Sequence, residues 1–480
     1  MLDIKNIKWV YALSIAFILI NALCTFFEFY YFNLIPAAIL VVLLALFSLD
    51  KLILLVVFLT PLAINLQHIE GGFGLSLPTE PIIFGIMLIF IFKQLHHNTM
   101  DARMLKHPIT IAIIVNLVWI LVTCITSDLP VVSFKFLVSR LWFVIVFYFL
   151  GTQLFKNYAN IKIFNWLYII SFTIIILYTL YNHALVNFDE HIANYIMSPF
   201  YNDHTIYGAM LAMFLPVLIF YMFNKKYSSS IRFAALLFFI VFVIALFFSY
   251  TRAAQGSLAV ALAVYVLLLF RIKFRTILTV FVAGVVIALC YQTEIVMYLE
   301  RNRQDASQDF DKNIQSISNI STDASNLERI NRWNAAFRMF AERPVFGWGP
   351  GTYSFEYAPF QQAHQKSIIS TNMGDKGNAH SEYIGPLSES GALGAATFLA
   401  IIICVLSTGF RLYYRIKENE TRKIVLVTLL GFITYIVHGG VNDFLDTDKA
   451  SVPFWGFVAM IVAIDIYHKN RGEDGEEIPA

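Results

Sequence analysis

Hydrophobic runs of roughly 15 to 24 residues recur along the chain from Trp9 to Tyr467, close to the length that a helix needs to cross about 30 Å of hydrocarbon. Hydrophobic residues make up 58% of the chain and charged residues 14%, against about 25% charged residues in soluble proteins. A membrane β-barrel would instead show short segments of alternating polarity. The sequence therefore predicts an all-α polytopic membrane protein, and its basic residues, which flank the runs, give no indication of nucleic-acid binding.

The predicted bundle has about 14 spans, or about 12 if the short pair around Asp50 is re-entrant. The predicted spans are 9–27, 33–49, 52–66, 82–92, 109–126, 141–155, 163–181, 206–223, 233–250, 256–270, 276–298, 392–410, 424–440 and 453–467. With the N-terminus in the cytoplasm, the basic segments all fall inside, as the positive-inside rule requires. These segments are 93–106, 156–162, 225–232, 271–275, 411–423 and 469–471.

This orientation predicts that both termini are cytoplasmic and that the polar segments between spans lie outside. The outer segments are 67–81, 127–140, 182–205, 440–451 and one long loop. The predicted divisions are a bundle of about 11 spans at 1–298, the large outer loop at 299–391, about three spans at 392–470 and an acidic cytoplasmic tail at 471–480. The first part of the loop, 301–326, is rich in Asn, Asp, Gln and Ser and is predicted to be a mobile connector.

The second part of the loop has a helical pattern. Ser325 and Glu328 are spaced as a capping box, and Pro344 is expected to follow the end of the helix. An apolar stripe at helical spacing is predicted at Trp333, Ala336, Phe337 and Phe340. The glycines within 347–351 then predict a tight turn that exposes its backbone.

Five basic side chains are candidates for binding phosphate. Arg252 lies where an apolar run meets the outer surface, and a charge there is costly unless it snorkels, pairs or binds a ligand. Arg329 and Arg332 are three positions apart on the predicted helix, so they share a face, and guanidinium groups match phosphate oxygens. The alternative for this pair is a solvated helix face. Lys135 and Arg140, in the predicted break 127–140, either bind phosphate or flank the next span.

Histidines in the outer segments are candidates for a general base. His380 precedes the span that re-enters the membrane after the long loop, and histidine accepts a proton near neutral pH. The alternative is a structural loop histidine. His204 lies in another outer segment, and His438 lies at the outer end of a span close to Asp443. The sequence leaves open whether these three imidazoles converge.

The sequence contains no P-loop, no nucleophile elbow, no dinucleotide fingerprint and no zinc-ligand spacing. Its four cysteines lie singly inside apolar runs. A zinc site formed by histidine and aspartate side chains stays possible without such a spacing. Nucleotide hydrolysis is not expected of this chain, so its substrate should carry its own activation.

Four short motifs follow one another between residues 249 and 394. They are Ser249-Tyr250-Thr251-Arg252, then Glu328-Arg329-x-x-x-Trp333, then Arg343-Pro344-Val345-Phe346-Gly347-Trp348-Gly349-Pro350-Gly351, and finally His380-Ser381-x-Tyr383 followed by Glu389-Ser390-Gly391. In order, spacing and position in the last large outer loop, this set resembles the O-antigen ligase / O-antigen polymerase superfamily of bacterial membrane proteins. The N-terminal half resembles the family only as a run of helices.

The resemblance implies a metal-independent, inverting glycosyltransferase of the membrane GT-C type that uses no cofactor. Such proteins take a glycan from undecaprenyl diphosphate and transfer it to an acceptor hydroxyl on the periplasmic side of the bacterial inner membrane. It implies that His380 is the base that activates the acceptor and that Arg252 and Arg329 neutralise the diphosphate. The remaining residues predicted to bind the substrate are Arg332, Lys135, Arg140, His204, Tyr383 and Glu389.

Among the family's activities, the preferred one is an O-antigen ligase that joins a glycan to lipid A-core. A repeat-unit polymerase, whose acceptor is the growing glycan, and a protein O-oligosaccharyltransferase remain open. A polysaccharide or lipid transporter is the alternative from another class. Transporters usually show internal repeats and charges within their spans, whereas here the charges gather in the outer segments.

Overall fold

The computed structural model describes most of the chain. The described residues are 4–65, 75–96, 100–190, 192–272, 276, 279, 324–366, 370 and 377–470. Three predicted features lie mostly or wholly outside them: the span 276–298, the connector up to residue 323 and the tail 471–480. These features therefore stay predictions.

Eleven helical segments among the described residues are long and apolar enough to cross a membrane, which confirms the predicted all-α polytopic membrane fold. They are η1–α2 (Tyr30–Phe47), α4 (Thr79–His96), α6 (Pro108–Ile125), α7–η2–α8 (Pro130–Leu154), α9 (Ala159–Leu185), α10 (His204–Phe223), α11 (Ser229–Phe248), α12 (Arg252–Leu269), α18 (Ile384–Arg415), α19 (Asn419–His438) and α20–η6 (Asp448–His468). The other elements are α1 (Ile4–Phe26), α3 (Leu49–Leu59), β1 (Ile64–Asn65), β2 (Ser76–Leu77), α5 (Ala102–Leu105), η3 (Ile192–Asn194), α16 (Ala324–Glu342), α17 (Tyr353–Glu356), η4 (Ala358–Phe360) and η5 (Ala363–Gln365).

One predicted span matches its helix and one is shorter in the structure. Helix α1 covers the predicted span 9–27 up to Phe26. The predicted span 52–66 is the 11-residue helix α3, which ends at Leu59. Pro61 follows after Thr60, and proline disfavours helical backbone at the residue before it.

The predicted polar break at 127–140 is wrong over most of its length. Helix α7 starts at Pro130, so only residues 126–129 separate it from α6. Proline is favoured in the first turn of a helix, where its missing N–H costs no hydrogen bond. Lys135 and Arg140 therefore lie on a helix that continues without interruption through η2 to Leu154. Their charges were mistaken for the signature of a loop.

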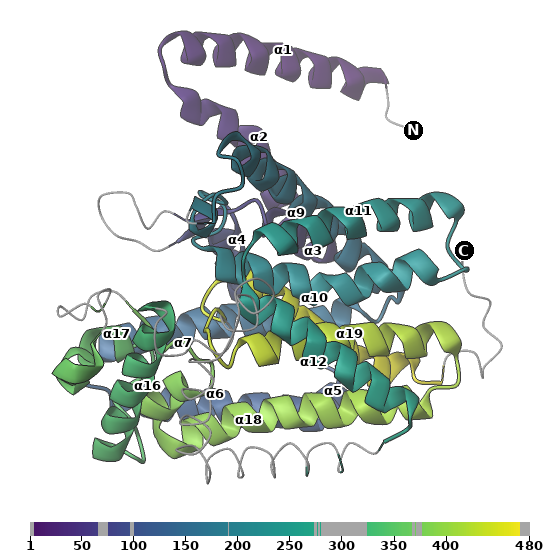
Figure 1. Cartoon of the computed structure of the whole chain (residues 1–480). Coiled ribbons are helices and arrows are strands. Elements are labelled where there is room, and N and C mark those ends of the chain that lie inside the picture. Colours follow the sequence, from purple (N-terminus) through teal and green to yellow (C-terminus); the bar gives the residue numbers. More distant parts are fainter. Residues whose placement is uncertain are drawn as a thin grey trace. The chain divides into compact units, whose positions relative to one another are not determined.

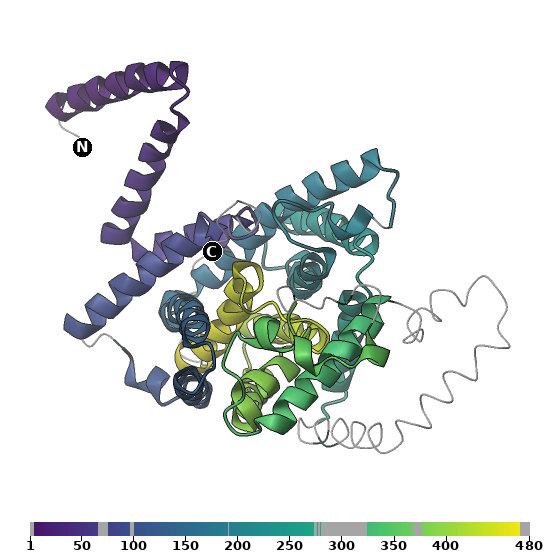
Figure 2. The same cartoon turned by 90° about the vertical axis from the view of Figure 1, so that its left-hand side faces the viewer.

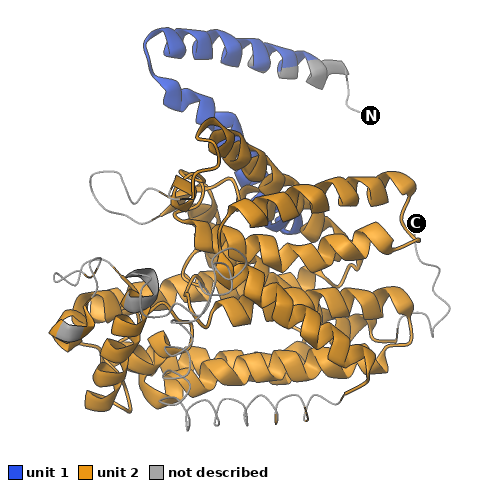
Figure 3. Cartoon of the chain, in the orientation of Figure 1, with its two compact units in different colours: residues 1–56 blue, residues 57–480 orange. Residues whose placement is uncertain are grey.

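The chain forms two compact units, residues 1–56 and 57–480 (Figure 3). In the first unit, the α1 side chain of Asn21 donates to the Asn33 carboxamide oxygen in η1 at 2.9 Å. The rings of Phe17 and Phe32 stack with centroids 5.2 Å apart. This division concerns packing only, and the domain boundaries expected around the long loop stay predictions.

Within the second unit, helices run alongside one another, with α16 and α17 gathered at one end of the bundle (Figures 1 and 2). α10 and α20 are the most deeply buried of the described spans. α10 is apolar around its whole circumference, which suits a central helix. At Gly431 of α19, an added Cβ would lie 2.5 Å from the Met213 carbonyl oxygen of α10, so a small residue allows these two helices to approach closely.

Helix α16 supplies one wall of a small core outside the spans. Ala336 and Met339 of α16 pack with Trp348, Tyr353 and other buried residues of the loop. The helix ends at Glu342, before Pro344 as predicted, and begins at Ala324, so Ser325 lies in its first turn rather than at the cap. The predicted apolar stripe is only partly right, because Phe337 is 47% exposed. The buried face of α16 also includes the polar residues Glu328, Asn331 and Arg332.

One end of the bundle gathers most of the predicted site residues. We call this the His380 end: it comprises the starts of α10, α12 and α18, the end of α19 and the adjoining helix α16. Because α19 has 20 residues, its two ends are about 30 Å apart. The opposite end, at the start of α19, is the Lys226 end.

Candidate functional site

The glycine-rich turn at 346–351 docks on a kink in α18. The backbone N–H groups of Trp348 and Gly349 donate to the carbonyls of Ser388 (3.1 Å) and Glu389 (2.8 Å). Gly391 interrupts the helical backbone with φ 70°. Gly347 also has positive φ, 68°, and a Cβ there would collide with the Glu389 carbonyl. The glycines that were predicted to expose the backbone therefore allow the turn to pack closely against α18.

Glu389 belongs to the same contact. One of its carboxylate oxygens accepts the backbone N–H of Tyr353 at 3.0 Å. This bond ties the residues after the turn to α18. The sequence predicted that Glu389 binds substrate, whereas the structure places its carboxylate on the protein backbone.

His380 lies on the segment 377–383, just before α18. Its backbone has φ 48°, a conformation that few residues other than glycine adopt. Its N–H donates to the side-chain oxygen of Asn378 at 3.2 Å. Burial, then the charges of Arg332 and Arg329, lower the pKa of His380 to about 3. The imidazole is therefore neutral at physiological pH, and its protonation is disfavoured as long as the two arginine charges are not offset.

Arg332 is buried and holds the segment 377–383 through a hydrogen bond. Its Nε donates to Glu328 Oε1 at 2.8 Å, and its Nη1 donates to the Asn378 carbonyl at 3.2 Å. Gly377 lies against the guanidinium so closely that a Cβ would overlap it. Arg332 thus holds the backbone two residues before His380, and its predicted role in binding substrate stays a prediction.

Arg329 faces a different surface from Arg332, although the two are three positions apart. Its Nε donates to the Val441 carbonyl at 3.3 Å. Its charge acts on His380 and also reaches His204 and His438. Arg329 therefore stands among all three histidines that the sequence offered as candidates.

His204 of α10 and His438 of α19 are the other two histidines near Arg329. The two imidazoles lie within electrostatic range of each other, and His438 Nε2 lies 3.0 Å from the Asn442 amide nitrogen. The Thr251 hydroxyl donates to the His204 carbonyl at 2.8 Å. Arg252, the next residue, is exposed at the start of α12. The structure thus links the beginning of α12 to the His204 end of α10.

A second set of titratable groups at the His380 end is acidic. Burial raises the pKa of Glu382 and of Asp446, and the charge of Arg140 opposes both shifts. Burial, followed by the charges of Glu382 and Asp446, raises the pKa of Asp443 well above its usual range. Arg140 therefore faces carboxylates, not the arginines and histidines around Arg329.

Two predicted site residues are not part of either set. Lys135 is exposed on α7 and makes no ion pair within the part of the chain that the structure describes. The Tyr383 hydroxyl donates to the Ile436 carbonyl at 2.6 Å. This contact gives Tyr383 a packing role between α18 and α19.

Several residues that shape the site were not singled out from the sequence. Glu382 and Asn378 hold the His380 segment through hydrogen bonds, and neither was a candidate. The one available signal was their place two residues after and two residues before His380. Glu328, which the sequence placed in a capping box and beside Arg329, accepts a hydrogen bond from Arg332. Among the described residues, no three His, Cys, Asp or Glu side chains are grouped so that they could hold a metal ion.

The arrangement pairs one neutral imidazole with neighbouring guanidinium groups. Such a pair suits a reaction in which a proton leaves one group while negative charge grows on another, because fixed cations stabilise a developing anion.

Residues 236–399 match the family model described as O-antigen ligase. The match contains Arg252, Arg329, Arg332 and His380, whereas Lys135, Arg140 and His204 lie before it. No curated protein matches the chain.

Proposed function

Since this chain belongs to the O-antigen ligase / O-antigen polymerase superfamily, we propose that it transfers a glycan from undecaprenyl diphosphate to an acceptor hydroxyl. The acceptor in this proposal is lipid A-core, and the reaction takes place at the His380 end. That end faces the periplasm, and both termini lie in the cytoplasm of a bacterium.

The observation that carries the proposal is the environment of His380. A single imidazole with its pKa lowered to about 3 stands within range of the charges of Arg332 and Arg329. A base must be unprotonated at working pH, and a diphosphate leaving group requires cations. Both requirements meet at this one place in the described structure.

In the proposed reaction, His380 takes the proton of the acceptor hydroxyl. The acceptor oxygen forms a bond to the anomeric carbon as the bond from that carbon to the diphosphate oxygen breaks. The electron pair leaves with undecaprenyl diphosphate, and attack from the opposite face inverts the anomeric centre. A bound diphosphate also offsets the arginine charges, which raises the basicity of His380 when the donor is in place.

Arg329 and Arg252 are proposed to hold the diphosphate. Arg329 is half-buried among the histidines, so its charge acts where water is partly excluded. Arg252 is exposed at the first turn of α12, where the partial positive charge of the helix end adds to its own. His204, at the start of α10, is proposed to donate a hydrogen bond on the same side.

The proposal is tested in a strain that lacks the native gene and expresses single variants. We expect His380→Ala and Arg252→Ala to abolish surface glycan on a gel while the protein remains in the membrane. His96→Ala and Arg422→Ala are the matched controls, because both side chains are exposed and lie away from the His380 end. Normal glycan in both site variants, at normal protein level, would overturn the mechanism.

The species that accumulates separates the members of the family. Loss of a ligase leaves long glycan chains on the lipid carrier, because polymerisation continues without transfer. Loss of a polymerase leaves single repeats on lipid A-core. The ligase proposal predicts long carrier-linked chains in the His380→Ala strain, and single repeats on lipid A-core would replace it with the polymerase.

A further inference from the structure

We infer that Glu382 is a positioning residue: its carboxylate fixes His380 relative to Arg329 by tying the base segment to the loop 439–445. This inference rests on the proposed function, because it gives Glu382 a role only through His380. It assigns a task to a buried acid that no motif singled out.

The side chain of Glu382 gathers three donors on one oxygen. Its Oε1 accepts the Tyr435 hydroxyl at 2.8 Å, the Phe444 N–H at 2.8 Å and the Leu445 N–H at 2.9 Å. The residue is 6% exposed. A carboxylate that accepts several donors in a buried place can occupy only one position.

The backbone of Glu382 makes a third link to the loop 439–445, because Tyr435 belongs to α19 and the side chain binds the loop only at Phe444 and Leu445. Its N–H donates to the Gly439 carbonyl at 2.9 Å. At Gly439, an added Cβ would lie 3.0 Å from the Glu382 Cγ, so the two segments touch closely. Upstream of the base, the Asn378 amide also reaches this loop, 3.5 Å from the Asp443 carbonyl. His380 is therefore pinned to 439–445 on both sides.

The same loop carries the partner of Arg329. The Val441 carbonyl accepts the Arg329 Nε at 3.3 Å. His438, at the end of α19, approaches Asn442 of this loop. The loop 439–445 is thus a common support: Glu382 anchors the base to it, and Arg329 binds it directly.

The conformation of His380 explains why such an anchor is needed. With φ 48°, its backbone lies in the left-handed region, which surrounding contacts must hold in place. Arg332 holds the segment before it and Glu382 the segment after it. Without the Glu382 contacts, the His380 imidazole is no longer held in one position. Catalysis is sensitive to displacements of about 1 Å, so the rate should fall.

The test compares Glu382→Gln with Glu382→Ala. Glutamine keeps an oxygen that can accept the same three donors, whereas alanine removes all of them. Initial rates of undecaprenyl diphosphate release are measured in membranes of the native host, over a range of carrier-linked glycan concentrations. We expect the alanine variant to lose about 100-fold in kcat with KM for the donor within about threefold, and the glutamine variant to stay within about threefold of the wild type.

A second variant protects the test against simple misfolding. Tyr435→Phe removes one of the three donors and keeps the ring, so it should lower kcat by less than Glu382→Ala and leave the amount of folded protein unchanged. The double variant His380→Ala/Glu382→Ala should be no slower than His380→Ala alone, since residues that act as a unit are not additive.

The outcomes separate this inference from the proposed function. If His380→Ala is inactive while Glu382→Ala keeps normal kcat, the positioning role is wrong and the proposed function stands. Equal losses in the glutamine and alanine variants would also overturn the positioning role, because the charge would then matter instead of the anchored oxygen. Full activity of His380→Ala would overturn both.

Discussion

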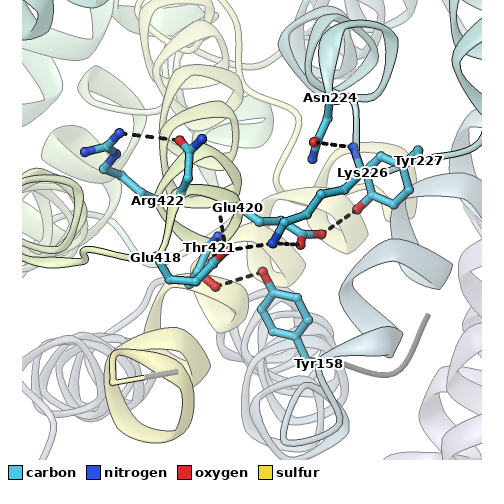
Figure 4. A network of polar contacts seen from close by, with 9 residues as sticks. Tyr158, Asn224, Lys226, Tyr227, Glu418, Glu420, Thr421 and Arg422 are labelled. Carbon is cyan, nitrogen blue, oxygen red and sulfur yellow. Dashed lines mark hydrogen bonds and ion pairs between the residues drawn. The ribbon is translucent and has the colours of Figure 1, made fainter. Parts of the chain in front are cut away.

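The two ends of the bundle both carry buried or half-buried charges, but they arrange them differently. At the Lys226 end, Lys226 Nζ lies 3.0 Å from Glu418 Oε1 and 3.1 Å from Glu420 Oε2 (Figure 4). The Tyr227 hydroxyl donates to Glu420 at 3.0 Å. At the His380 end, the charges of Arg332 and Arg329 act on His380, and the buried acids Glu382, Asp443 and Asp446 act on one another.

The pKa shifts follow this difference. Burial opposes ionisation of Glu418, but backbone N–H donors at Thr421 and Glu420 and the ammonium of Lys226 outweigh it, and its pKa falls to about 2. At the His380 end the shifts go toward the neutral forms, down for His380 and up for Asp443. The Lys226 end pairs one lysine with two carboxylates, whereas at the His380 end the Arg332–Glu328 pair stands beside Arg329, whose charge acts on three histidines. The first arrangement stabilises a fold, and the second is suited to a charged ligand.

Apart from His380 itself, the largest predicted effect is at Arg329. Arg329→Ala removes a cation beside both the base and the proposed diphosphate, and we expect kcat for glycan transfer to fall about 100- to 1,000-fold. Arg422→Ala, an exposed arginine at the Lys226 end, should leave kcat within twofold. The measurement is the initial rate of undecaprenyl diphosphate release per folded protein. Equal rates in the two variants would contradict the assignment of the reaction to the His380 end.

The next effect concerns stability at the Lys226 end. Glu418→Ala removes the N-cap of α19 and one partner of Lys226, so the free energy of unfolding should fall by about 1–3 kcal/mol. The rate per folded molecule should not change. Thermal unfolding of the protein in detergent, followed by an assay of the folded fraction, measures both. Normal stability with slow transfer would mean that Glu418 takes part in the reaction, which would contradict the assignment of the reaction to the His380 end.

The pH dependence of stability gives a smaller effect with a defined sign. The pKa of Glu418 is lowered from 4.5 to about 2 in the folded state, so its stabilisation is fully present above pH 4.5 and is lost as the pH falls toward 2. Glu418→Gln should lack this component. The stability difference between wild type and variant should therefore shrink from pH 6 to pH 3. A difference that grew on acidification would contradict the shift.

The smallest effect is expected at Lys135. The sequence predicted that it binds substrate, but it is exposed on α7 and without an ion pair among the described residues. Lys135→Ala should change the unfolding free energy by less than about 0.5 kcal/mol and the transfer rate by less than about twofold. A large loss of rate would restore the prediction made from the sequence.

The membrane fold followed from the sequence because the length and composition of an apolar run depend on local residues alone. The start of α7 did not, because Lys135 and Arg140 resemble a loop until the neighbours of that helix are known. Arg329 and His380 were found from the types of residue and their order. Glu382 was missed because its partners Tyr435 and Leu445 lie 53 and 63 positions away. Contacts at such separations have no periodic signal in a single sequence.

The most direct test of the His380 end as the site of transfer is the kinetics of purified His380→Ala. The measured quantity is the rate of undecaprenyl diphosphate release against the concentration of carrier-linked glycan, with lipid A-core present. Removal of a general base predicts a kcat lower by about 100- to 10,000-fold with the KM for the donor nearly unchanged, while His96→Ala keeps normal rates. A kcat within twofold of the wild type would contradict the assignment.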